Sequence, residues 1–347
     1  MVKMLAFLRL TRPLNLLIMA ATMLLIRYGL IVGHLERGLT QLLRETDTTA
    51  TRDQLILDPG FGPQLPLYLF ILLVMSTVLI AAGGNVINDY FDTRIDRINK
   101  PGQVIVGRTV KRRVAMMGHL LLSGLGFLCA AVVAWRTGLW HLLVIPAFAI
   151  AALWTYSTTF KRQLIIGNGS VALLTALVPL TVGLYEIPAM QATFAAHSIV
   201  ALPTGEQYQM EAYFPELWYW ILGFAAFAFL SSLVRELQKD MADVKGDEAN
   251  GCRTVPIVWG MRWARVLTLT YIGALILVLL ALHMAIPSFR GDLPFWYIQL
   301  GIILPLLLSA GFTYNAVQRE EHVRAGNLMK VAMVMGVGFA AIVRFLP

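Results

Sequence analysis

Charge is scarce in this sequence. Of its 347 residues, 14% are charged and 58% are hydrophobic, whereas soluble domains are typically about 25% charged. A water-soluble fold cannot bury so much apolar surface, because its polar residues would be too few to cover it. The composition therefore excludes an ordinary soluble enzyme and indicates a membrane protein.

Cysteine is also rare. The two cysteines, Cys129 and Cys252, form neither a disulfide framework nor a pair with the spacing of metal ligands. The histidines show no spacing typical of metal ligands or of a catalytic triad, so we interpret them as structural; they are His34, His119, His141, His197, His283 and His322.

Long apolar stretches, by contrast, fill most of the chain. Stretches near the bilayer-spanning length of about 20 residues lie at 14–33, 67–87, 114–134, 139–155, 168–185, 217–233, 264–284, 294–312 and 328–345. We therefore expect an all-α fold, a bundle of nine transmembrane helices, with residues 1–347 forming a single membrane-embedded domain. Two loops on one side, at about 34–66 and 187–216, are longer than a minimal connection.

The basic residues are distributed unevenly between the two sides. If the N-terminus is cytoplasmic, the inner segments hold 21 of the 28 Lys and Arg residues, and the outer loop 187–216 holds none. The positive-inside rule then predicts a protein of the inner (cytoplasmic) membrane with its N-terminus inside and its C-terminus outside. This topology explains the net charge of +8, so a nucleic-acid partner is not expected.

The first acidic segment begins where the second apolar stretch ends, and it reads NDYFDTRID. If the helix continues through this segment, Asn88, Asp92 and Asp96 recur every four residues and share one face with Asp89. Stacked carboxylates repel one another at this spacing. The pattern is therefore favourable only if cations lie among them.

The second acidic segment follows the sixth apolar stretch and repeats this arrangement. Glu236, Asp240, Asp243 and Asp247 are spaced four, three and four residues apart, which again places them on one helical face. Hard oxygen ligands without His or Cys favour magnesium, which commonly shares its coordination with substrate phosphates. Either run alone reads equally well as a solvated helix end, but two aligned runs favour a metal site in the inner segments 88–113 and 235–262.

Basic residues near these segments are candidates for binding phosphate. Lys161, in YSTTFKR after the fourth stretch, is the strongest, and weaker candidates are Arg12, Arg94, Lys100 and Lys239. Each reads equally well as a positive-inside anchor. Asn15 in the first stretch either lines the site or makes a hydrogen bond between helices.

These motifs together resemble those of a known family. NDYFDTRIDRINKP and RELQKDMADVKGDEANGCRTVP are similar to the two aspartate-rich motifs of the UbiA-type intramembrane prenyltransferases, and TRPLN, YSTTFKR and the nine apolar stretches extend the resemblance over nearly the whole chain. Within that family the second motif is most similar to that of the digeranylgeranylglyceryl phosphate synthases and their bacterial relatives. One departure is that residues 99–108 read NKPGQVIVGR, without the second Arg-Pro usual in those enzymes, which leaves the acceptor open.

The resemblance implies a helical bundle with a central cavity open to the cytoplasmic side, and an enzyme that uses magnesium, with two ions expected. It implies transfer of a geranylgeranyl group from its diphosphate to a hydroxyl of a prenylated glycerol phosphate, with membrane lipids as surroundings. The metal ligands it implies are Asn88, Asp89, Asp92, Asp96, Asp240, Asp243 and Asp247. Asp92, Asp96, Asp243 and Asp247 would be catalytic, and the substrate-binding residues would be Lys161, Asn15, Tyr156, Arg94, Lys100 and Lys239. The aromatic side chains Trp154, Tyr156 and Phe160 would either stabilise an allylic cation or simply pack.

Two alternatives remain open at this point. The first is a prenyltransferase with an aromatic acceptor, as in quinone or haem biosynthesis. The second, more distant, is a cation transporter with acidic vestibules. A transporter needs ionisable residues inside the membrane, and apart from Arg27 and Glu186 we expect no charge in the interior of these spans.

Overall fold

The computed structural model describes residues 2–37, 62–197, 199–201, 207–209 and 214–346. Nine helices among these residues are long and apolar enough to cross a membrane, so the expected all-α bundle is confirmed. They comprise α2 (Pro13–Leu24) with the π-helical η1 (Leu25–Ile31), α5 (Leu67–Phe91), α7 (Arg112–Thr137), η2 (Trp140–Leu143) with α8 (Val144–Thr158), α9 (Ile166–His197), α10 (Pro215–Ala249), α12 (Met261–Ala285), α13 (Asp292–Trp296) with η5 (Tyr297–Ile303) and α14 (Leu304–Asn315), and α15 (Arg319–Ile342).

Short elements connect these helices. They are α1 (Val2–Leu10), α6 (Thr93–Asn99), η3 (Phe160–Arg162), α11 (Val255–Val258), η4 (Pro287–Arg290) and η6 (Val343–Phe345). Two three-residue strands, β1 (Ile199–Ala201) and β2 (Gln207–Gln209), pair antiparallel beyond the end of α9. This small hairpin is the only sheet among the described residues, and it leaves the all-α class unchanged.

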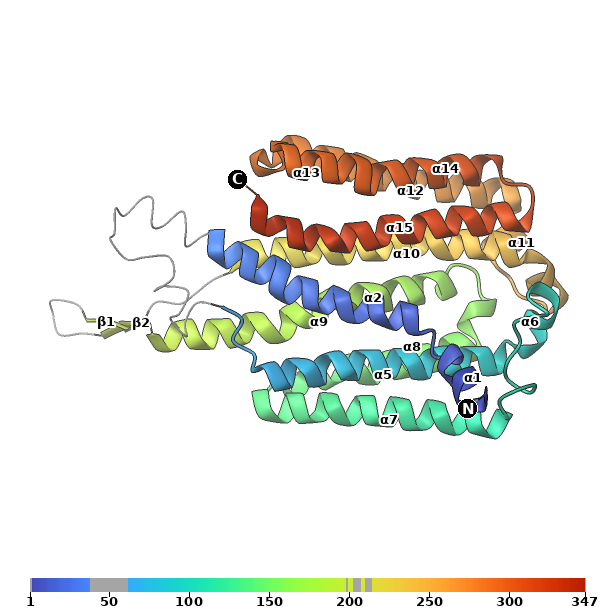
Figure 1. Ribbon diagram of the computed structural model, residues 1–347, viewed down its shortest axis with the longest axis horizontal. Helices are drawn as coiled ribbons and strands as arrows, with labels where there is room; N and C mark the ends of the chain where they lie inside the picture. The colour runs from blue at the N-terminus through green and yellow to red at the C-terminus, as the bar shows by residue number, and fades with distance from the viewer. Residues whose placement is uncertain (1, 38–61, 198, 202–206, 210–213, 347) are drawn as a thin grey trace.

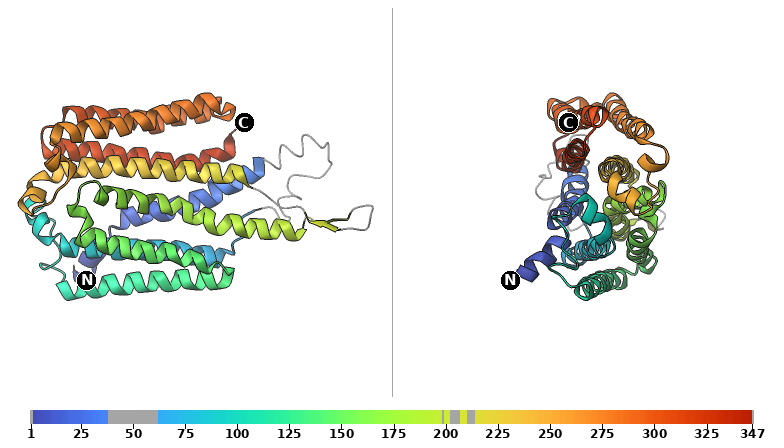
Figure 2. Two further views of the ribbon diagram at one scale, coloured as in Figure 1. Left: turned by 180° about the vertical axis from the view of Figure 1, so that it is seen from behind. Right: turned by 90° about the vertical axis from the view of Figure 1, so that its right-hand side faces the viewer.

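The long helices run side by side along the longest axis of the molecule (Figure 1). The N-terminus, α6 and α11 lie at one end of the bundle, and the C-terminus and the β1–β2 hairpin lie at the other. The reverse view and the end-on view agree with this arrangement (Figure 2). The two acidic segments therefore reach the same end of the bundle, which we call the motif end.

Small residues allow the helices to pack closely, as is common in membrane bundles. A Cβ added at Gly126 of α7 would lie 2.9 Å from the Ser76 carbonyl oxygen of α5. A Cβ at Gly29 in η1 would lie 2.7 Å from the carbonyl oxygen of Ala340 in α15. These glycines bring the first and last spans, and the second and third, into backbone contact.

Several expected boundaries were wrong. Helix α9 continues past residue 185 to His197 with Pro179 and Pro188 inside it, so the outer loop begins later than 187. The inner segment 235–262 is largely helical because α10 runs unbroken to Ala249. Hydropathy windows follow apolar length and cannot detect a helix that extends into polar sequence. Most of the other outer loop, residues 38–61, lies outside the described residues.

Candidate active site

The first acidic motif spans the junction of α5 and α6. Helix α5 ends at Phe91, and Asp92 occupies the junction with φ −81° and ψ 0°. The Asp92 amide still donates to the Asn88 carbonyl at 2.9 Å, and the Asp96 amide donates to the Asp92 carbonyl at 2.8 Å. The four-residue backbone spacing is thus maintained across the break between the two helices.

The second motif lies on the uninterrupted helix α10, as its spacing required. Glu236 and Asp243 are buried, with 4% and 8% of their surface exposed. The Asp240 carboxylate accepts a hydrogen bond of 2.8 Å from the Asn168 amide at the start of α9. The sequence alone did not indicate Asn168 as a site residue, because an isolated Asn near a helix start has many ordinary roles.

The two motifs meet through the end of α6. The Asn99 side-chain amide donates to the Asp243 backbone carbonyl at 3.0 Å, and its Oδ1 accepts the Gly246 amide at 2.9 Å. The Lys100 ammonium lies 3.3 Å from the Asp243 carboxylate. Asp92 is also close enough to Asp247 to repel it electrostatically. Carboxylates separated by about 150 residues of sequence therefore share one site.

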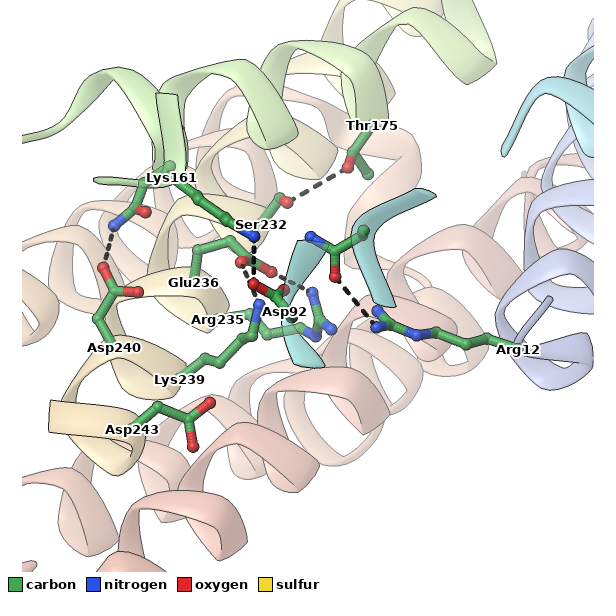
Figure 3. A network of polar contacts seen from close by, with 12 residues as sticks. Arg12, Asp92, Lys161, Thr175, Ser232, Arg235, Glu236, Lys239, Asp240 and Asp243 are labelled. Atoms are coloured by element: carbon green, nitrogen blue, oxygen red, sulfur yellow. Dashed lines mark hydrogen bonds and ion pairs between the residues drawn. The ribbon is translucent and has the colours of Figure 1, made fainter. Parts of the chain in front are cut away.

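Basic side chains from other elements face these carboxylates (Figure 3). Lys161, in η3, forms an ion pair with Asp92. Arg12, before α2, pairs with Asp89 at 2.6 Å. Arg319, at the start of α15, lies 3.3 Å from the Asp243 carboxylate. Lys161, Arg12 and Lys100 thus lie beside the carboxylates, and Arg319 adds a residue that the sequence indicated only as a positive-inside anchor.

The carboxyl group of Asp96 has a raised pKa. Burial, followed by the neighbouring Asp92 charge, raises the pKa of the Asp96 carboxyl from 3.8 to about 6. Lys100 opposes this effect but does not cancel it. Burial and the Asp92 charge therefore outweigh the nearby Lys100 at Asp96.

The fit of this site to a metal follows from its donors. As the side chains stand, no three acidic, His or Cys side chains among the described residues are grouped closely enough to hold a metal ion. The reason is that Asp92 and Asp243 are turned to Lys161, Lys100 and Arg319. The donor set is nevertheless all oxygen, and its carboxylates repel one another, so it suits magnesium bound jointly with phosphate.

A cavity of about 340 Å³ opens beside the acidic motifs. At its polar end it is lined by six of the residues singled out from sequence, namely Arg12, Asn15, Asn88, Tyr156, Glu236 and Lys239. Its remaining wall is mostly apolar and comes from α2, α5, α8, α9, α10 and α15, with side chains such as Met19, Ile80, Leu153, Leu174, Phe227 and Val334. A polar head at one end and an apolar tail along the wall would match this shape.

Other residues from the sequence analysis lie apart from the cavity. Arg94 is exposed and is not among the residues that line it. Trp154 packs against Phe91 and His119, with ring centroids 5.9 and 5.5 Å apart. Of the three candidate aromatic residues, Tyr156 alone lines the cavity.

The segment without the second Arg-Pro begins at Asn99 and Lys100, which contact Asp243, and then continues into turns. Arg108 donates a hydrogen bond of 3.0 Å to the Pro101 carbonyl. Val106 and Val110 pack with Leu10 and Val86 in a small core at the motif end. Arg319 approaches Asp243 from α15.

The expectation that charge inside the spans is limited to Arg27 and Glu186 was wrong. Arg235, Glu236 and Lys239 of α10 and Lys330 of α15 all line the cavity. Helix α15 begins at Arg319 rather than near 328, so Lys330 lies well inside it. Side chains that face a polar cavity avoid the lipid, and hydropathy alone does not distinguish the two environments.

Comparison with known proteins decides the family. A family model described as the UbiA prenyltransferase family matches residues 60–335. The chain belongs to this family. As a UbiA-family protein it is an integral membrane prenyltransferase, and the cation-transporter alternative is set aside.

A curated relative agrees with this assignment, and solved structures share the fold. The digeranylgeranylglyceryl phosphate synthase of Thermococcus kodakarensis is 30% identical over 291 residues, covering 84% of this chain and 88% of that protein. A UbiA homolog from Aeropyrum pernix K1 has a similar fold, with a TM-score of 0.57, 17% identity and coverage of 94% and 98%. A UbiA homolog from Archaeoglobus fulgidus bound to GPP and Mg2+ has a TM-score of 0.54, 14% identity and coverage of 97% and 99%.

Proposed function

We propose that this UbiA-family enzyme transfers a geranylgeranyl group from its diphosphate to a hydroxyl of a prenylated glycerol phosphate, in a magnesium-dependent reaction. One observation carries the proposal: the two acidic motifs meet at the polar end of an apolar cavity, joined by Asn99 and Lys100. The acceptor follows from the relatives, which are named digeranylgeranylglyceryl phosphate synthase.

Magnesium is the expected partner of the carboxylates. We propose that Asn88, Asp92 and Asp96 hold it from one side and Asp243 and Asp247 from the other, with two ions. Asp89 and Asp240, which bond Arg12 and Asn168, complete the proposed set of ligands. Bound magnesium would neutralise charge that develops on the leaving diphosphate.

The protein's own groups would perform the remaining work. Lys161 and Lys100 lie beside the carboxylates and would bind diphosphate oxygens. The apolar wall would exclude water from the allylic carbon as its bond to oxygen breaks. Tyr156, at the polar end, would place an aromatic face beside that carbon. Arg94, being exposed, would act on the substrate only from outside the cavity.

The proposed transfer breaks one bond of the donor and forms one bond to the acceptor. The allylic C–O bond of the donor breaks, and the bonding electrons leave with the diphosphate. The acceptor hydroxyl oxygen bonds to the freed carbon, and its proton passes to the released diphosphate. A phenol acceptor would react in the same way, with the new bond formed at its ring. The acidic motifs alone therefore do not distinguish a glycerol phosphate acceptor from a phenol.

The placement in the membrane is part of the proposal. We propose that residues 1–347 act as one membrane-embedded domain in the inner membrane, with the motif end and the N-terminus cytoplasmic and the C-terminus outside. The count of basic residues supports this orientation. Labelling of single cysteines introduced at each end of the bundle in intact cells would test it.

The direct test of the reaction is incubation of the purified protein with geranylgeranyl diphosphate, magnesium and one acceptor at a time, with products read by mass spectrometry. We expect product with geranylgeranylglycerol phosphate and none with phenolic acceptors. Product with a phenolic acceptor alone would contradict the proposed acceptor, and no product with any acceptor would contradict the proposed reaction.

A further inference from the structure

The cavity holds more positive charge than the acidic motifs account for. Four basic residues line it, and we call them the cationic cluster: Arg12, Arg235, Lys239 and Lys330. Glu236 is the single carboxylate among the described residues that line it. Buried or membrane-embedded charges normally have a counter-charge. The excess therefore indicates that a negatively charged group enters this cavity.

Most of the cluster has partners within the protein. Glu236, with 5% of its side chain exposed, lies 2.6 Å from Arg235 and 3.5 Å from Lys239. Arg12 pairs with Asp89, which is outside the cavity wall. The Glu236 carboxylate thus neutralises only one of the two cations that contact it. One positive charge of Arg235 and Lys239 therefore remains uncompensated at the cavity wall.

Lys330 has no such partner. Lys330 is exposed and lines the cavity, and it makes no ion pair or hydrogen bond with any residue in the described part of the chain. The charges that act on it are the like charges of Arg235, Arg12 and Lys100, opposed by Glu236. An unpaired lysine inside a membrane-spanning helix is costly, and such residues usually serve a ligand.

Arg235 and Lys330 lie deeper in the bundle than the acidic carboxylates, whereas Arg12 and Lys239 lie beside the motifs. Arg235 precedes Asp243 by eight residues on α10, which corresponds to about 12 Å along the helix axis. Lys330 lies eleven residues into α15 from Arg319, or about 16 Å along its axis. None of Asp92, Asp96, Asp243 and Asp247 lines the cavity. Two separate regions are therefore available for two different anions.

We propose that Lys330 and Arg235 bind the phosphate of the acceptor lipid, a phosphomonoester of a prenylated glycerol. This inference rests on the proposed function and names the part of the cavity that would recognise its acceptor. A phosphomonoester carries between one and two negative charges at neutral pH, which matches the excess of the cluster. The planar Arg235 guanidinium can bind two phosphate oxygens, and Lys330 adds a point charge.

The position also suits the reaction. Glycerol has three carbons, so the free hydroxyl of the acceptor is at most two carbons from the one that carries phosphate. A phosphate on Lys330 and Arg235 would hold this hydroxyl between the cluster and the acidic motifs, where the donor's reactive carbon would lie. A phenolic acceptor without an anionic group would leave Lys330 without a counter-charge.

The test compares Lys330→Gln with the unaltered enzyme on two acceptors, geranylgeranylglycerol phosphate and the alcohol that lacks the phosphate. We expect kcat/KM for the phosphorylated acceptor to fall about 10- to 100-fold, as for a lost hydrogen bond to a charged group. We expect kcat/KM for the alcohol and KM for the donor to stay unchanged. Lys330→Arg should restore most of the loss, and Arg324→Gln, an exposed basic residue on the same helix, should have no effect. An equal loss on both acceptors, or a raised KM for the donor, would overturn the proposal.

Binding separates this proposal from the proposed reaction. Geranylgeranylglycerol phosphate is titrated into the protein in EDTA without donor, where no transfer takes place. We expect binding that weakens about 10- to 100-fold in Lys330→Gln. Equal binding by both proteins would overturn the phosphate site even if transfer proceeds. Lys330-dependent binding without transfer would support the site and contradict the reaction.

Discussion

The Gly246 amide donates a hydrogen bond of 2.9 Å to the side-chain oxygen of Asn99. This bond connects α10 to the end of α6, and the same Asn99 side chain also bonds the Asp243 carbonyl. The two acidic motifs are therefore held together by one neutral side chain. Their alignment does not depend on the ion pairs alone.

Gly246→Ala tests this connection. A Cβ at Gly246 would overlap the Asn99 side chain, so that side chain must shift and lose its hydrogen bonds to α10. Because misplaced catalytic groups lower rates sharply, we expect a loss of transfer of about 100-fold, with insertion and folding retained. Steady-state rates with geranylgeranyl diphosphate check this. Gly223→Ala on the same helix, where an added Cβ meets nothing within 4 Å, is the matched control, and an equally active Gly246→Ala would contradict the connection.

Removing one carboxylate from either motif should stop the reaction. We expect Asp92→Asn and Asp243→Asn each to lower kcat by at least about 100-fold, since each removes a charge from a preorganised electrostatic site. Both variants should insert and elute as the unaltered protein does in size-exclusion chromatography. Asp292→Asn, at the start of α13 at the opposite end of the bundle (Figure 1), serves as control. Near-normal turnover in either motif variant would remove that residue from the site.

The effect of magnesium on stability should depend on pH. The pKa of Asp96 is raised from 3.8 to about 6 in the folded protein, so the folded state binds this proton more tightly than the unfolded state does. Without metal, the folded state therefore becomes less stable relative to the unfolded state as the pH rises from 3.8 to about 6, and it stays less stable above that pH. Magnesium would compensate the ionised carboxylate. We expect magnesium to raise the Tm more at about pH 7.5 than at about pH 5, and equal shifts in thermal scans would contradict this.

A buried ion pair far from the motif end should contribute strongly to the thermal stability of the protein. Arg27 and Glu186 are 4% and 0% exposed, with Nε and Oε2 3.6 Å apart. The Leu65 amide also donates to Glu186 at 2.9 Å. Breaking such a buried pair from one side costs about 3–5 kcal/mol, so Arg27→Met should lower the Tm markedly. Arg27→Met combined with Glu186→Gln should lower it less, because no buried charge is left alone. A larger loss in the double variant would contradict the pairing.

The sequence predicted the parts of this structure that have strong local patterns. Apolar length located the nine spans, and the spacing of Asp240, Asp243 and Asp247 predicted a shared helical face, because both signals repeat within a few residues. That the two motifs meet was inferred from their similar acidic composition. The hydrogen bonds of Asn99 to α10 give this inference a structural basis.

Contacts made across long sequence separations could not be predicted in this way. Arg319 and Lys330 read as inner anchors because positive-inside counting cannot tell a lysine at a helix end from one in a cavity. Asn168 pairs with Asp240 across 72 residues, and no local pattern marks such a partner. The helical extension of α10 was obscured because its polar turns lower the hydropathy of any window that contains them.

The most direct test of the central claim is the magnesium-dependent binding of geranylgeranyl diphosphate, measured by calorimetry on the unaltered protein, Asp92→Asn, Asp243→Asn and the double variant. If both motifs bind one metal-bound diphosphate, either substitution alone should weaken donor binding about as much as the two together. The reason is that the effects of substituting neighbouring groups that act as a unit are not additive. Independent, additive losses, or donor binding of full strength in EDTA, would contradict the account.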